Sequence, residues 1–146
     1  MSEIGADGRL EVGRSASVAR TLSNADIEAF AALSGDTNPL HVDPEYAQAT
    51  LFKGTIAHGM LTASLISALL GTRMPGPGSV YVSQSLRFKR PVRGGDEVEV
   101  KATVTALDPA KGLATLSTVC KVRGKVVVEG EAVVQPPAGL MPKAAA

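Results

Sequence analysis

A twelve-residue apolar segment constrains the fold more than any other part of the chain. Residues 59–70 read GMLTASLISALL, and Gly71 follows them. The segment is apolar nearly all round, and a helix without a polar face is a buried helix. At about twelve residues it is too short to span a bilayer, so another layer of the protein must cover it.

The chain after this segment has the pattern of β-strands. Four stretches with alternating or β-branched residues follow, at 79–90, 96–108, 113–122 and 125–135. Short connections separate them, such as PVRGG between the first two and Arg123-Gly124 between the last two. Because the buried helix has no other partner, the sequence predicts an α+β fold in which an antiparallel sheet wraps around it.

Shorter elements are predicted before the buried helix. A strand is expected at 16–22, followed by a helix with Ser23 as its N-cap and Asp26 three residues later. Gly35 fits the end of that helix. Asp43 followed by Pro44 predicts the start of a further short helix through residue 49.

Length and charge narrow the classes of protein. A chain of 146 residues is long enough for one domain, expected over 1–146 with loose ends at about 1–9 and 136–146. The net charge of +1 and the 3% of aromatic residues argue against nucleic-acid binding. The start of the chain has no apolar run, so no membrane segment is expected and a cytoplasmic location is the default. The single cysteine, Cys120, lies in a predicted strand and is expected to be a packed thiol.

The stretch SGDTNPLHVDP at 34–44 contains one of the two histidines of the chain. Since Pro39 disfavours a helical residue before it, the segment is expected to be a loop. A loop can bring the Asp36 carboxylate and the His41 imidazole to one point, where they would form an acid–base pair. Asn38 would hold the loop by bonding its backbone. On spacing alone, a structural turn is the favoured interpretation, because Asp near a helix end followed by Asn-Pro is common turn chemistry.

The second histidine, His58, lies directly before the buried helix, and Gly59 opens it. The Gly59 amide is therefore one of the unpaired donors at a helix N-terminus, which can hold an oxygen that gains negative charge. The alternative is that Gly59 only lets the chain turn into the helix and that His58 caps or packs there.

These residues resemble a known family. ALSGDTNPLHVDPEYA resembles the hydratase motif of the R-specific enoyl-CoA hydratases in the MaoC-like dehydratase group, with matches at Asp36, Asn38, Pro39, His41, Asp43, Pro44 and Ala47. IAHGMLTASLISALLG and SLRFKRPVRGGDEVEV are similar to the family's central helix and first long strand, and the resemblance covers roughly 10–135. The sequence departs from the motif at Ala32, where the family often has an aromatic residue; Phe30 lies nearby.

The resemblance implies a single hot-dog domain and a set of catalytic roles. Asp36 and His41 would activate a water, with Asp36 as base and His41 as the residue that orients the water and delivers a proton, although these two roles are interchangeable in a coupled pair. The Gly59 amide would receive the thioester oxygen. Ser67 falls where family members have a hydroxyl near the water, and its alternative is a buried serine bonded to a carbonyl one turn back.

Substrate contacts are expected from several further residues. Asn38 and His58 would support the site, and Leu65 and Leu70 of the buried helix would contact the acyl chain or else belong only to the core. The phosphates of coenzyme A need cations, and a basic cluster lies near one strand end. Solvated surface is an equally good account of its members, which are Arg87, Lys89, Arg90 and Arg93.

The expected activity is reversible (R)-specific hydration of trans-2-enoyl-CoA to (R)-3-hydroxyacyl-CoA by a hydro-lyase. Such a homodimeric enzyme needs no metal or organic cofactor, and its product can supply polyhydroxyalkanoate synthesis. One alternative is a hydratase for a specialised branched or dicarboxylic acyl-CoA, although the buried helix offers no cation for a second carboxylate. The other is a non-catalytic acyl-CoA binding module, which would not need both Asp36 and His41.

Overall fold

One antiparallel sheet forms the body of the molecule in the computed structural model, which describes residues 8–143. Its strands lie in the order β1-β4-β5-β6-β2, and β3 also pairs with β6. Each of these pairs is antiparallel. The strands are β1 (Ser15–Thr21), β2 (Val80–Gln84), β3 (Arg87–Phe88), β4 (Glu97–Asp108), β5 (Leu113–Val122) and β6 (Lys125–Gln135).

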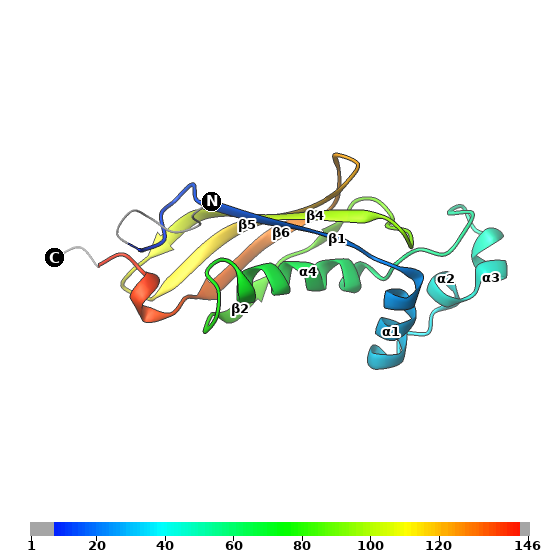
Figure 1. Ribbon diagram of the computed structural model, residues 1–146, viewed down its shortest axis with the longest axis horizontal. Helices are drawn as coiled ribbons and strands as arrows, with labels where there is room; N and C mark the ends of the chain where they lie inside the picture. Colours follow the sequence, from blue (N-terminus) through cyan, green and yellow to red (C-terminus); the bar gives the residue numbers. More distant parts are fainter. Residues whose placement is uncertain (1–7, 144–146) are drawn as a thin grey trace.

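Helix α4 (Gly59–Thr72) lies along one face of this sheet (Figure 1). Alternate residues of β4 and β5 are buried and form one core with the inner side of the helix. Ile66 and Leu69 have no exposed surface, and full burial of such a side chain contributes about 1.5–3 kcal/mol. The α+β hot-dog arrangement predicted from the sequence is therefore confirmed.

Burial of α4 is nevertheless one-sided. Met60 is 57% exposed, and Ser64, Ser67 and Ala68 on the same stripe are also exposed. The expectation of a helix buried all round is wrong for this stripe, because the sheet covers one face only. The uncovered stripe leaves apolar surface that a single copy of the chain does not bury.

Helix α1 (Asn24–Ser34) begins and ends at the predicted residues. The Ser23 hydroxyl accepts the Asp26 amide at 3.0 Å, and the Asp26 carboxylate accepts the Ser23 amide at 2.9 Å. The hydrogen bonds from the Ser23 backbone and hydroxyl hold the pKa of Asp26 below its usual range. Gly35 closes the helix in the left-handed conformation, with φ of 78°.

The segment predicted as a loop before Asp43 contains one helical turn, α2 (Pro39–Val42). Asn38 stays non-helical, as a residue before proline should. It becomes the N-cap instead, since its Oδ1 accepts the Leu40 amide at 3.0 Å. Proline at the first helical position suits the turn that follows, so His41 projects from a helix and not from a loop.

Asp43 caps the next helix as predicted, and α3 (Pro44–Gln48) follows it. Its carboxylate accepts the amides of Glu45 and Tyr46. Helices α1, α2 and α3 gather at one end of the molecule, near the start of α4 (Figure 1).

The strand expected over 79–90 is divided in two. Both β2 and β3 pair with β6, and β2 is interrupted by an irregular register between Tyr81 and Ser83. The other three predicted strands form as β4, β5 and β6. Cys120 lies in β5 without exposed surface, and burial raises its pKa to about 12. The thiol is packed, as expected, and the raised pKa keeps it protonated at neutral pH.

The two described ends of the chain lie against each other, and Met141, within the range 136–146 expected to be loose, is buried. The Leu10 amide donates to the Leu140 carbonyl at 2.8 Å, and Met141 is 8% exposed. A short 3₁₀ helix spans Ala138–Leu140. Residues 1–7 and 144–146 lie outside the described part. Between residues 8 and 143, no helix has the length and hydropathy needed to cross a membrane.

Candidate active site

Asp36 lies on a tight turn between α1 and α2. Its amide donates to the Ser34 hydroxyl at 3.1 Å, and the Asn38 amide donates to its Oδ1 at 3.3 Å. Directly before it, Gly35 reverses the chain at the end of α1. These local bonds fix the turn while the Asp36 side chain remains exposed.

His41 projects from α2 and is held by a main-chain carbonyl. Its Nδ1 lies 2.7 Å from the Ile56 oxygen. A carbonyl oxygen only accepts, so Nδ1 carries a proton and donates it. The Ile56 amide in turn donates to the Leu40 carbonyl at 3.2 Å. Proton exchange with a substrate is therefore left to His41 Nε2.

His58 connects the two segments that carry Asp36 and His41. It is 2% exposed and occupies the N-cap of α4. Its Nε2 lies 2.9 Å from the main-chain oxygen of Asp36, so this nitrogen carries the proton and donates. Its ring lies 3.9 Å from the His41 ring, centroid to centroid, with 30° between the planes, and the Phe30 ring lies 4.9 Å away.

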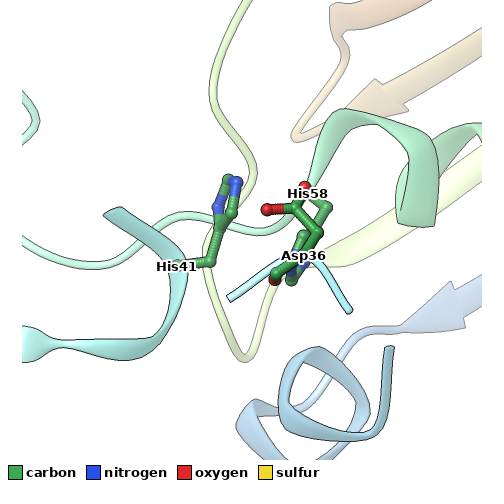
Figure 2. A group of neighbouring side chains, drawn as sticks. All are labelled: Asp36, His41 and His58. Carbon is green, nitrogen blue, oxygen red and sulfur yellow. The ribbon is translucent and has the colours of Figure 1, made fainter. Parts of the chain in front are cut away.

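Figure 2 shows these three side chains gathered from separate segments of the chain. Ligand-type atoms of Asp36, His41 and His58 all lie within 4.8 Å of one another. The residue types would suit a metal ion. One nitrogen of each ring already faces a main-chain carbonyl, His41 Nδ1 that of Ile56 and His58 Nε2 that of Asp36. The remaining ring nitrogens and the Asp36 carboxylate are groups that can exchange protons.

A pocket of about 470 Å³ opens beside this group. Asp36, His41, His58 and Gly59 line it together with Phe88 from β3. Gly59 is the first residue of α4, so its amide has no partner within the helix. Asp36, His41 and the start of α4 at Gly59 therefore line one mainly apolar pocket.

Comparison with known proteins identifies the family. The family model described as MaoC like domain matches residues 8–130. The chain belongs to the MaoC-like family.

The relatives of this MaoC-like protein are similar over most of their length. An (R)-specific enoyl-CoA hydratase from Rhodospirillum rubrum is 60% identical over 129 residues, which is 88% of this chain and 90% of that protein. A 3-hydroxybutyryl-CoA dehydratase from Methylorubrum extorquens is 49% identical over 88% of this chain and 82% of that protein. The solved structure of an (R)-hydratase from Aeromonas caviae, described as involved in PHA biosynthesis, matches with a TM-score of 0.85 at 52% identity. It covers 88% of this chain and 98% of that one.

Three residues expected at the site of this MaoC-like domain lie elsewhere. Ser67 is exposed and lines a second pocket of about 480 Å³, together with residues of β2. Leu65 and Leu70 are buried in the core between α4 and the sheet. Helical spacing from Gly59 predicted a shared face, but eight residues along α4 carry Ser67 two turns away from the first pocket. Met60 lines both pockets and lies between them.

Asn38 and the basic cluster have separate positions. Asn38 acts as the cap of α2 and does not line the pocket. Lys89 and Arg90 do line it, with Lys89 paired to Glu129 at 3.5 Å. Arg87 lines a different hollow, over β5 and β6.

Arg93 is used within the fold. Its guanidinium donates to the Phe52 carbonyl, and its amide donates to the Asp96 carboxylate at 2.9 Å. The basic cluster is therefore divided between the pocket, the surface and the internal bonds of the chain.

Thr62 and Phe88 are among the pocket residues that the sequence analysis did not single out. Thr62 is 1% exposed and lies one turn after His58, a spacing that brings the two residues to one face. The Phe88 ring packs directly against Gly59. A Cβ on that glycine would lie 2.5 Å from the Phe88 ring atoms Cδ1 and Cε1. Only the tertiary approach of β3 to α4 reveals this contact.

The reason for glycine at position 59 is thus close approach and not backbone conformation, because Gly59 is not among the described glycines with positive φ. Gly59→Ala is expected to lower the free energy of unfolding by about 1–2 kcal/mol, since the Phe88 ring must shift. In a Phe88→Ala background the same change should be neutral or stabilising. Chemical denaturation of the four proteins measures this difference. Equal effects of Gly59→Ala in both backgrounds would contradict the contact.

Proposed function

We propose that this protein catalyses the reversible (R)-specific hydration of trans-2-enoyl-CoA to (R)-3-hydroxyacyl-CoA. The observation that carries the proposal is one pocket lined by the Asp36 carboxylate, the His41 ring and the start of α4 at Gly59. Relatives with this activity in their names are 60% and 52% identical over 88% of the chain. A binding module would need the pocket but not an acid–base pair inside it.

The proposed reaction adds the parts of one water across the C2–C3 double bond. The water oxygen bonds to C3 while one of its protons passes to the Asp36 carboxylate. The proton then moves from Asp36 to His41 Nε2, which is bare in the resting ring because Nδ1 carries the ring proton, and from Nε2 to C2, so that both residues return to their starting state. His41 Nδ1 stays bonded to the Ile56 carbonyl throughout, at 2.7 Å in the resting site. The two roles belong to a coupled pair.

Negative charge develops on the thioester oxygen as water adds. The Gly59 amide, aided by the dipole of α4, is the proposed donor to that oxygen. An oxyanion donor of this type contributes about 3–4 kcal/mol to stabilisation of the transition state. The Phe88 ring against Gly59 keeps this end of the pocket apolar, which strengthens such a hydrogen bond.

Purified wild type is expected to hydrate trans-2-enoyl-CoA substrates between C4 and C12 and to give the (R)-alcohol. Asp36→Asn and His41→Gln are each expected to lower kcat by roughly 100- to 10,000-fold, because each removes one member of the acid–base pair. Loss of the enoyl-thioester absorbance measures the rate, and chiral chromatography of the product measures the configuration.

Glu45→Gln is the matched control for Asp36→Asn, because Glu45 is an exposed acid of the neighbouring helix α3 and does not line the pocket. It should keep the wild-type rate. Acyl-CoA binding without turnover at any chain length would favour a binding module and reject the hydratase. An (S)-product would reject the assigned stereochemistry.

The working form is proposed to be a homodimer of single hot-dog domains. Strand β2 pairs only with β6 among the described residues, so its outer edge is open. Val80 and Val82 on this strand are each 55% exposed, and the open stripe of α4 lies nearby. An unpaired apolar edge is a site at which a second copy can add its own strand. The opposite edge strand, β1, is mainly polar outside.

Light scattering at micromolar concentration should therefore give twice the 15.0 kDa mass of the chain. Val82→Lys is expected to shift the protein toward monomer, because it puts a charge into the paired edge. Val12→Lys, a similar change at a 62% exposed valine outside the sheet, should leave the dimer intact. A monomeric wild type would reject the dimer.

The proposed reaction is redox-neutral and needs no metal or organic cofactor. Dialysis against a chelator should therefore leave turnover unchanged. We further propose a cytoplasmic enzyme whose (R)-3-hydroxyacyl-CoA product supplies polyhydroxyalkanoate synthesis. A relative described as involved in PHA biosynthesis supports this role, and polymer content after deletion of the gene tests it.

A further inference from the structure

His58 and Thr62 carry two buried polar atoms that the proposed reaction does not use. His58 Nδ1 and Thr62 Oγ1 are both fully enclosed, and neither has a hydrogen-bond partner within the described part of the chain. An unpaired buried polar atom costs about 1–3 kcal/mol, so such a pair in one place calls for a physical account.

The protonation of His58 follows from its other nitrogen. Nε2 faces the main-chain oxygen of Asp36 at 2.9 Å, and a carbonyl can only accept. Nε2 therefore carries the ring proton. In the neutral ring Nδ1 is then a bare lone pair, which needs a donor.

Thr62 offers that donor. The Thr62 amide already donates to the His58 carbonyl at 3.2 Å, so the two residues occupy successive turns at the start of α4. Both side chains line the pocket that contains Asp36. Rotation about the Cα–Cβ bond of threonine moves its hydroxyl without moving the helix. His58 Nδ1 needs a hydrogen-bond donor, and the Thr62 hydroxyl can be that donor.

We propose that Thr62 and His58 are positioning residues, in which the Thr62 hydroxyl donates to His58 Nδ1 and thereby holds His58 Nε2–H on the Asp36 carbonyl. The chain of bonds runs from the rigid start of α4 to the main chain of the catalytic carboxylate. The neutral His58 ring also supports the face of His41 at 3.9 Å. The expected effect on kcat rests on the proposed hydratase function. The tautomer of His58 does not depend on that function.

Thr62→Val and Thr62→Ser separate hydrogen bonding from packing. Valine keeps the shape of threonine but lacks the hydroxyl, while serine keeps the hydroxyl but lacks the methyl group. If the hydroxyl matters, kcat falls about 10- to 100-fold in Thr62→Val with KM nearly unchanged, because the carboxylate is misplaced. Thr62→Ser should then stay closer to wild type. If Thr62 only fills space, the order of the two variants is reversed.

His58 itself provides a second series. Glutamine can keep an N–H donor near the position of Nε2, whereas leucine cannot. His58→Gln is therefore expected to retain more of kcat than His58→Leu. Thr72→Val is the matched control, since its exposed hydroxyl bonds to the Ala68 carbonyl at the far end of the same helix. It should leave kcat and KM unchanged.

Nitrogen-15 NMR of the histidine rings tests the tautomer without substrate. The chain has only two histidines, so both rings can be assigned from the His41→Gln variant. Wild type should have His58 protonated at Nε2 and bare at Nδ1, and Thr62→Val should disturb this state. A proton on Nδ1 in wild type, or a Thr62→Val protein with unchanged His58 signals and unchanged kcat, would overturn the proposal. If wild type has the predicted His58 tautomer but shows no hydratase turnover, only the hydratase function is rejected.

Discussion

Burial of α4 against the sheet is the interaction on which the rest of the site depends. Ile66 and Leu69 are fully enclosed by the core, so the helix cannot slide or rotate without exposing them. Its N-terminus is therefore fixed in space, and with it the Gly59 amide and the His58 ring. The turn that carries Asp36 is not part of the core. It is attached to this fixed point by the His58–Asp36 bond and by the His41–Ile56 bond.

This arrangement explains how an exposed carboxylate can still be held in place. Asp36 is exposed, but its main-chain oxygen is bonded to a buried imidazole, and its own carboxylate accepts the Asn38 amide. The side chains that contact substrate can remain accessible, because rigidity comes from their backbone. The outer stripe of α4 and the edge of β2 stay uncovered in one copy of the chain. The second pocket lies between them, and the proposed dimer would close it.

Local sequence signals predicted the parts of the structure that depend on local chemistry. The Ser23–Asp26 capping box, the Gly35 stop and the Asp43-Pro44 start all form as expected. The motif around Asp36 and His41 also predicted correctly that the two side chains share a pocket. Tertiary approach was not predictable in the same way. The contact of Phe88 with Gly59 joins segments about thirty residues apart, and the two-turn offset of Ser67 depends on how α4 is rotated on the sheet. The apolar pattern of α4 also does not distinguish burial within one chain from burial by a second copy. The sequence therefore predicted a helix buried all round, whereas one copy of the chain covers one face only.

The central claim is that Asp36 and His41 act as one unit on one water. The most direct test is the kcat of the Asp36→Asn/His41→Gln double variant beside both single variants, with crotonyl-CoA as substrate. The effects of residues that act as a unit are non-additive. The kcat of the double variant should therefore be about equal to that of the less active single variant. Losses that multiply in the double variant would contradict the account, because they would mean that the two side chains act independently.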